Sequence, residues 1–260
     1  DFHVQNNADL TIAVLDVSYD EATRLGIMTC NEDMQIIDFE EKPKQPKSTL
    51  ASMGIYVFSW EKLKKYLIEN ENANTGSKDF GKDIIPSMLQ NNERLFAYSF
   101  EGYWKDVGTL DSLWEANMDL LSPNSPLDLY DLKWKIYSRN SNMPPQYIGS
   151  NANIENSMIS EGSNIDGTVD FSVVFSGVTI EEGASVKYSI VMPGSVIKKG
   201  AIVEYAIVGE ECVIENNAHI GRSPETIENK DDWGIAVVGH NVTISESKEV
   251  KPKQIIADSI

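Results

Sequence analysis

The chain is short of cysteine, of basic residues and of long apolar runs. Only Cys30 and Cys212 occur, far apart and without metal-ligand spacing, which fits a reducing compartment better than a disulfide scaffold. We therefore expect a cytoplasmic protein. No apolar run approaches the roughly 20 residues of a membrane-spanning helix, so no membrane partner is expected. With 22 basic against 40 acidic residues, the formal net charge of −18 also makes nucleic acid an unexpected partner.

The glycines are spaced so that one common phosphate-binding loop is missing. No two of the 17 glycines are two residues apart, so there is no Gly-x-Gly loop whose backbone N–H groups hold a triphosphate. The chain also opens at Asp1, without an initiator Met, on residues that resemble the tail of a helix. We therefore expect a fragment of a longer polypeptide.

The first half alternates strand and helix patterns, which favours the remaining part of a doubly wound α/β domain over 1–122. Residues 26–30 and 34–39 flank a three-residue loop, which predicts a hairpin with Gly26 and Lys42 at the same end. A helix is expected over 82–90, with Pro86 marking a break or restart inside it. Thr109 is expected to cap a further helix.

Residues 123–147 lose this alternation and carry prolines and aromatic side chains. We interpret them as an ordered linker whose aromatic residues lie against a domain surface. The aromatic residues are Tyr130, Trp134 and Tyr137, and the prolines are Pro123, Pro126, Pro144 and Pro145.

Residues 148–260 repeat with a period of six. One branched apolar residue recurs every six positions, with a small residue four positions later. Such hexapeptides are typical of a parallel β-helix in which equivalent residues stack from coil to coil. Residues 221–233 interrupt the pattern, and Val238 and Ile244 are expected to resume it as a C-terminal cap. The longest run of the repeat is Ile190, Val196, Ile202, Val208, Ile214 and Ile220.

Three short motifs in the first half carry groups suited to a sugar phosphate beside Mg²⁺. They are residues 39–43 (FEEKP), 52–56 (SMGIY) and 103–109 (YWKDVGT). A lysine ammonium meets phosphate oxygens as a compact charge. Mg²⁺ is usually bound by one or two carboxylates together with substrate phosphates. At these motifs, in this order and followed by hexapeptides, the chain resembles the bacterial glucose-1-phosphate adenylyltransferases (ADP-glucose pyrophosphorylases) of the sugar nucleotidyltransferase family, and looks like their C-terminal part.

The resemblance implies a role for five residues. Gly26, Glu41, Lys42 and Ser52 would contact glucose 1-phosphate, and Asp106 would bind the catalytic Mg²⁺. Lys42 and Asp106 would be the catalytic residues. The resemblance also implies a left-handed β-helix and a homo-oligomer, a tetramer in that family. The segment DFGKD, residues 79–83, matches the family as well, but the sequence assigns it no chemistry.

Each of these residues also has an ordinary interpretation. Lys42 is a solvated lysine before a proline, Ser52 a polar residue at a strand start, and Asp106 an acid stabilised near a helix N-terminus without any metal. One of Glu40 and Glu41 must be ordinary, since neighbours on a strand point to opposite faces. We assign the sugar contact to Glu41.

The resemblance implies adenylyl transfer from ATP to glucose 1-phosphate, giving ADP-glucose and pyrophosphate for glycogen synthesis. Such a transfer requires that the protein position the substrates and neutralise their charge more than that it react covalently. Without the nucleotide-binding loop, we expect this chain alone to be inactive. Three alternatives stay open: a sugar-1-phosphate nucleotidyltransferase using UTP or GTP, a noncatalytic regulatory subunit, and acyl transfer through His219.

Overall fold

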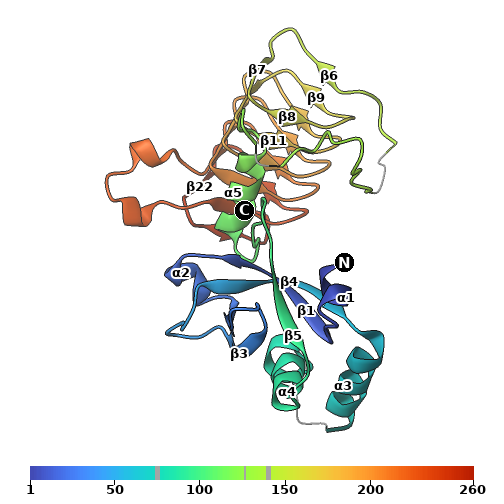
Figure 1. The fold of residues 1–260 in the computed structure, drawn as a ribbon. Coiled ribbons are helices and arrows are strands. Elements are labelled where there is room, and N and C mark those ends of the chain that lie inside the picture. The colour runs from blue at the N-terminus through green and yellow to red at the C-terminus, as the bar shows by residue number, and fades with distance from the viewer. Residues whose placement is uncertain (74–76, 126, 139–141) are drawn as a thin grey trace. The chain divides into compact units, whose positions relative to one another are not determined.

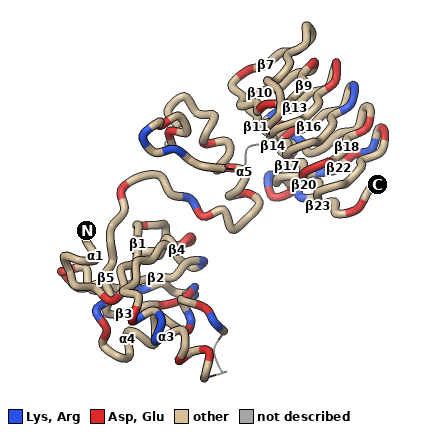
Figure 2. Tube along the Cα trace, turned by 90° about the vertical axis from the view of Figure 1, so that its right-hand side faces the viewer, with Lys and Arg blue, Asp and Glu red and all other residues tan. Residues whose placement is uncertain are grey.

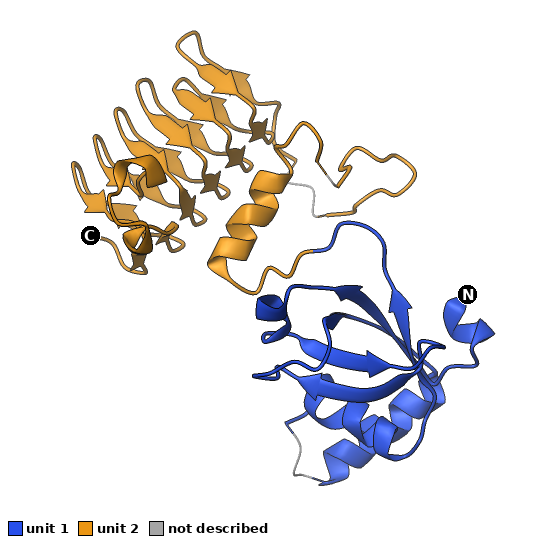
Figure 3. Ribbon diagram, turned by 60° about the vertical axis from the view of Figure 1, so that its left-hand side comes forward, with its two compact units in different colours: residues 1–104 blue, residues 105–260 orange. Residues whose placement is uncertain are grey.

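The computed structural model describes residues 1–73, 77–125, 127–138 and 142–260, so Pro126 lies outside the described residues. These residues form two compact units, residues 1–104 and residues 105–260 (Figure 3). The expected order, an α/β part followed by a parallel β-helix, is confirmed, and the sheet of the α/β part is mixed. The expected domain boundaries, 1–122, 123–147 and 148–260, stay a prediction, since the compact units divide the chain by packing alone.

The first unit is a five-stranded mixed sheet. Its strand order is β3-β2-β4-β1-β5, and of these pairs only β1 and β5 run parallel. The strands are β1 (Leu10–Asp16), β2 (Gly26–Cys30), β3 (Ile36–Glu41), β4 (Leu50–Phe58) and β5 (Leu95–Ser99).

Helices α3 and α4 cover one face of this sheet (Figure 1). Tyr66, Ile85 and Met88 from the helices form one core with Leu10 and Ile12 of β1. The helical elements of the unit are α1 (Phe2–Gln5), α2 (Tyr19–Ala22), α3 (Trp60–Ala73), the π-helix η1 (Phe80–Ile84) and α4 (Ile85–Gln90).

Two local predictions of the first unit are confirmed. The hairpin pairs Gly26 with Glu41, and the Lys42 N–H donates to the carbonyl of Leu25 over 3.1 Å. The expected restart at Pro86 is the change from the π-helix to α4, whose first turn contains this proline. Proline is tolerated there because it has no N–H to leave unpaired.

The second unit is built on three parallel sheets that together form the β-helix (Figure 1). We call the sheet β23-β20-β17-β14-β11-β8 the double-apolar sheet. Its strands are β8 (Met158–Ile159), β11 (Val173–Val174), β14 (Ile190–Val191), β17 (Ala206–Val208), β20 (Ala236–Val238) and β23 (Ile255–Ile256).

The other two sheets of the β-helix also have six strands each. One contains β7 (Asn153–Glu155), β10 (Thr168–Asp170), β13 (Ser185–Lys187), β16 (Ile202–Glu204), β19 (His219–Ile220) and β22 (Glu249–Val250). The other contains β6 (Tyr147–Ile148), β9 (Asn164–Ile165), β12 (Thr179–Ile180), β15 (Val196–Ile197), β18 (Val213–Ile214) and β21 (Thr243–Ile244).

The strict six-residue ladder is wrong. Val186, Val203 and Ile220 pair from coil to coil, and consecutive members are 17 residues apart, since 203 − 186 and 220 − 203 are both 17. Three steps of six would give 18, so a count by six loses the register once per coil. It selects Ile202, which is 39% exposed, where Val203 is fully buried. Likewise Ile197, and not Val196, lies in the core.

The miscount has a physical cause in the double-apolar sheet. Each of its central strands carries two adjacent apolar residues: one joins the interior of the β-helix and the other faces outward. The outward residues Val173, Ile190 and Ile207 are buried with Met118 of α5 (Leu110–Asp119). Ile190 is therefore buried, but outside the coil. Figure 3 shows α5 alongside the coils of its own unit.

Serine side chains link consecutive coils at one corner. Ser172 N–H donates to Ser157 Oγ, Ser189 N–H to Ser172 Oγ, and Ala206 N–H to Ser189 Oγ, each over 3.1 Å. The small residues of the repeat therefore do more than leave room for a turn, because these hydroxyls satisfy buried backbone donors that have no strand partner.

The interruption of the repeat is confirmed. Residues 224–232 hold two short 3₁₀ helices, η2 (Pro224–Thr226) and η3 (Lys230–Asp232), and the coils then resume. Val238 pairs with Val208 and Ile244 with Ile214, as expected of a continued stack. The left-handedness inferred from the resemblance stays a prediction.

The aromatic side chains of residues 127–138 do not lie against a surface of the described chain, so that expectation is wrong. Tyr130, Trp134 and Tyr137 are 78%, 82% and 89% exposed. Aromatic content indicates that a side chain gains from burial, but it does not identify the surface that would bury it.

Charged residues of the β-helix gather at the corners between strands (Figure 2). Lys198 pairs with Glu215 over 2.8 Å, and Lys199 with Glu182 over 3.2 Å, each reaching a neighbouring coil. Among the described residues, no helix has both the length and the apolar character needed to cross a membrane.

The 17-residue register predicts unequal effects for two identical substitutions. Ile197→Ala should lower the free energy of unfolding by about 2–5 kcal/mol, because Ile197 is fully buried in the coil interior. Ile202→Ala should cost under about 1 kcal/mol, since Ile202 faces outward. Urea unfolding followed by circular dichroism measures both. A larger loss for Ile202→Ala than for Ile197→Ala would support the six-residue register instead.

Candidate functional site

Three of the five predicted site residues form one row across neighbouring strands. Gly26 of β2 pairs with Glu41 of β3, and Ile27 pairs with Ala51 of β4. One residue further along these antiparallel strands, Ser52 lies beside Gly26. Residues directly opposite each other on paired strands share a face of the sheet. The row Glu41, Gly26, Ser52 therefore presents a carboxylate and a hydroxyl on either side of a position without a side chain.

A Cβ at the centre of this row would crowd two neighbouring side chains. A Cβ on Gly26 would lie 2.7 Å from the Phe39 ring and 3.1 Å from Glu41 Oε2. The same carboxylate is approached from the other side by Gly81 of η1, where a Cβ would lie 2.5 Å from Glu41 Oε2. The Glu41 carboxylate thus occupies a space bounded by two glycines that are far apart in the sequence.

Lys42 follows the row and leaves the strand direction. Its φ is 50°, in the left-handed region that turns the chain. Its side chain is 63% exposed, and Nζ lies 3.7 Å from Glu41 Oε1. The ammonium therefore stands at the edge of the row with most of its surface available. Glu40 is instead held by Lys47, whose Nζ is 3.3 Å from Glu40 Oε1. This is the ordinary role expected for one of the two glutamates.

The segment DFGKD, to which the sequence assigned no chemistry, forms a wall beside Glu41. The Asp79 carboxylate accepts a hydrogen bond from Lys82 N–H over 2.9 Å and caps η1. The Asp83 carboxylate accepts one from Asp79 N–H over 3.1 Å, and this backbone hydrogen bond lowers the pKa of Asp83. Both bonds stabilise the turn that places Gly81 against Glu41. A π-helix at such a place agrees with the frequent occurrence of these turns at functional sites.

Asp106 lies outside this row, in the second compact unit. The sequence predicted a loop directly before a helix N-terminus, and the Thr109 side chain does cap α5 by accepting from Ser112 N–H over 3.1 Å. Asp106 is exposed, and among the described residues no hydrogen bond or ion pair engages its carboxylate. A Cβ on Gly108 would lie 3.0 Å from Asp106 Oδ2, so a small residue leaves this carboxylate room.

The donor set at Asp106 fits a magnesium ion shared with a substrate. Within the described part of the chain, no group of three or more His, Cys, Asp or Glu residues is placed to hold a metal ion. Mg²⁺ does not need such a group, because it keeps several waters and is often bound by one or two carboxylates plus substrate phosphates. An unpaired, exposed carboxylate meets that requirement, and a protein-only metal cage does not exist here among the described residues.

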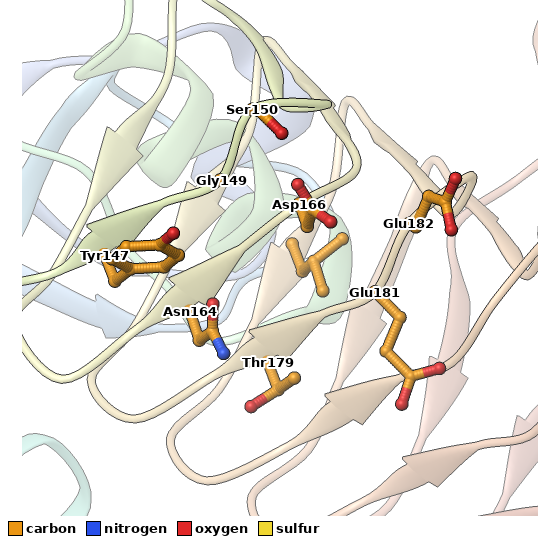
Figure 4. A pocket seen from close by; sticks show the side chains of 9 residues that line it. Tyr147, Gly149, Ser150, Asn164, Asp166, Thr179, Glu181 and Glu182 are labelled. Carbon is orange, nitrogen blue, oxygen red and sulfur yellow. The ribbon is translucent and has the colours of Figure 1, made fainter.

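Two of the cavities among the described residues are not lined by residues of the row. One of about 750 Å³ in the first unit is mostly apolar and includes Trp104 and Tyr98 in its lining. The other, of about 340 Å³, lies on the β-helix (Figure 4). Its Asp166 carboxylate is already bonded to Asn151, and its Glu181 accepts from Lys199 N–H over 2.9 Å.

His219, the candidate base of an acyl transfer, faces outward from the coil. Its Nε2 lies 2.8 Å from Glu204 Oε1 on the neighbouring coil. This contact gives one ring nitrogen of a half-buried histidine a carboxylate partner.

Comparison with known families matches two different families to successive parts of the chain. The nucleotidyl transferase family matches residues 1–123. The family described as GlmU-like, C-terminal hexapeptide, matches residues 143–244.

Curated relatives extend this comparison across most of the chain. A glucose-1-phosphate adenylyltransferase of Geobacillus stearothermophilus is 57% identical over 188 residues, which are 72% of this chain and 48% of the relative. The enzyme of the same name from Clostridium beijerinckii is 56% identical over 187 residues, which are 72% of this chain and 48% of the relative. The enzyme of Bacillus cereus is 55% identical over 186 residues, which are 72% of this chain and 50% of the relative. The chain thus spans about half the length of the curated relatives it matches.

The space around Glu41 predicts an unusual cost for a helix-favouring substitution. Alanine in place of glycine inside a helix normally stabilises by roughly 0.5–1 kcal/mol. Gly81→Ala should instead destabilise slightly, by about 1 kcal/mol or less, because its Cβ would displace the Glu41 carboxylate. Thermal and urea unfolding measure the change. In a Glu41→Ala background the same substitution should be neutral or stabilising, and an unchanged cost there would contradict the contact.

Proposed function

Because this chain is a homologue of the glucose-1-phosphate adenylyltransferases, we propose that it supplies the sugar-phosphate half of such an enzyme. The reaction is adenylyl transfer from ATP to glucose 1-phosphate. A phosphate oxygen of the sugar ester attacks the α-phosphorus of ATP, the bond from that phosphorus to the bridging oxygen of the β-phosphate breaks, and pyrophosphate leaves with that oxygen. The products are pyrophosphate and ADP-glucose, and ADP-glucose serves glycogen synthesis.

The row Glu41, Gly26, Ser52 is the observation that carries this proposal. A carboxylate and a hydroxyl on one face, separated by a glycine, suit the hydroxyl groups of a sugar ring that lies over the glycine. The adjacent Lys42 ammonium is the natural partner for the phosphate group of the same molecule. Lys42 would neutralise and orient the attacking phosphate, which is already an anion and needs no general base.

Asp106 would hold the magnesium ion together with substrate phosphates. When bound, the ion would neutralise charge that develops around the α-phosphorus. Within this chain, the contribution of Asp106 is one carboxylate, exposed and free of protein partners among the described residues.

We further propose that these 260 residues do not catalyse the reaction by themselves. They contain no Gly-x-Gly loop for a triphosphate, and they span about half of their relatives. We expect the active form to be a homo-oligomer in the cytoplasm. The two cysteines, both free thiols, suit a reducing compartment.

The alternative substrates and roles differ in what they require of the same residues. A relative using UTP or GTP would keep the sugar-phosphate row and change the base contacts. A noncatalytic subunit has no need of an exposed Lys42 beside a buried row. Pyrophosphate release from a panel of nucleoside triphosphates and sugar phosphates, using the complete polypeptide, distinguishes these possibilities.

Lys42→Ala should raise KM for glucose 1-phosphate by about 10- to 100-fold, because a charged hydrogen bond of about 1.5–3 kcal/mol is lost. KM for ATP should change little. Lys44→Ala is the matched control, since Lys44 is an exposed lysine in the same segment. Steady-state kinetics on the full-length enzyme measure both constants. An unchanged KM for glucose 1-phosphate would remove Lys42 from the site.

A further inference from the structure

Lys105, the residue directly before Asp106, is tied to the helix that follows it. Its Nζ lies 3.0 Å from Glu115 Oε2 and 3.1 Å from Asp119 Oδ2. These two acids are four residues apart, so they stand one above the other on one face of α5. Lys105 is only 27% exposed. Its ammonium therefore fastens the chain before Asp106 to the second half of α5.

The chain after Asp106 is fastened to the same helix at its other end. Thr109 caps the first turn of α5 through Ser112. Residues 105–109 are thus a short loop whose two ends are both bonded to one helix, while Asp106 inside it has no protein partner among the described residues. A loop held at both ends presents its free side chain in a narrow range of positions.

The helix is in turn fixed to the β-helix. Trp114 Nε1–H donates to the carbonyl of Tyr188 over 2.7 Å, and Met118 is buried against the outward residues of the double-apolar sheet. The Tyr188 ring is stacked on that of Tyr205 in the next coil, with centroids 4.8 Å apart and an interplanar angle of 3°. The support of the loop therefore extends from α5 into the stacked coils.

We propose that Lys105 is a positioning residue for Asp106, which holds the loop so that its carboxylate is ready to bind a divalent cation. This inference rests on the proposed function, in which Asp106 is a magnesium ligand. Lys105 itself does not touch the ion. Its charge is balanced locally by Glu115 and Asp119, so it can stand beside a cation site without opposing it.

The direction in which Lys105→Met changes the affinity for a cation distinguishes a positioning role from a simple effect of charge. Lys105→Met removes a positive charge one residue from a cation site, and by charge alone this should tighten cation binding. If Lys105 positions the loop, the same change should weaken binding, because an untethered loop must be ordered when the ion binds. We expect the dissociation constant for Mn²⁺ to rise about 10-fold or more, as for other residues that orient a metal ligand.

The experiment uses Mn²⁺ as the probe, which favours the same carboxylate ligands as Mg²⁺. Mn²⁺ is titrated into the full-length enzyme in the presence of ADP-glucose, and free Mn²⁺ is read by electron paramagnetic resonance. Lys105→Arg keeps the charge and both partners and should restore most of the affinity. Lys199→Met is the control, since Lys199 forms an exposed ion pair with Glu182 elsewhere on the same unit.

Two further variants make the outcomes decisive. Asp106→Asn should lose Mn²⁺ binding; if it binds like the wild type, the metal role in the proposed function fails. If Asp106→Asn loses binding while Lys105→Met retains it, only the positioning role is overturned. Glu115→Gln with Asp119→Asn removes the tether and keeps Lys105, and it gives a second test should Lys105→Met fail to fold, since lost charge and lost positioning both weaken binding in it. Wild-type Mn²⁺ affinity in this double variant would also overturn the proposal.

Discussion

The structure depends on the double-apolar sheet, which is buried on both of its faces. Its inward residues form the interior of the β-helix, and its outward residues, such as Ile190 and Ile207, seat α5. Burial of apolar surface is worth roughly 25 cal/mol per Å², so the central strands of this sheet contribute to stability through both faces. Because α5 is fixed there, the loop that begins at Lys105 is fixed as well.

In the first unit, the Glu41 side chain is constrained by the space left around it and not by the burial of apolar surface. Gly26 and Gly81 leave room for one carboxylate, and neither position tolerates a Cβ without moving Glu41. The register of the strands places Gly26 beside Glu41, and the π-helix η1 places Gly81 against the same carboxylate. A short polar site is thereby held by backbone on two sides, which limits the rotamers open to its central side chain.

Local chemistry made much of this predictable from the sequence. The hairpin that pairs Gly26 with Glu41 follows from strand patterns on either side of a three-residue loop, and Thr109 follows from the preferences of helix N-caps. The coil period was missed because double-apolar strands such as Val173–Val174 offer two branched residues, and a count along the chain cannot tell which faces inward. The approach of Gly81 to Glu41 joins positions 40 residues apart (81 − 41), for which no local pattern exists.

The interruption after Ile220 shows how the coil stack treats extra sequence. Ile220 pairs with Val250, a separation of 30 residues (250 − 220) where the preceding coil has 17 (220 − 203), yet the column continues without a fault. Gly221 makes this possible, since a Cβ there would overlap the carbonyl oxygen of Glu204. Stacking, and not the number of residues between strands, therefore sets the alignment. A foreign peptide grafted between η2 and η3 would project from this corner and leave the coils on either side in place.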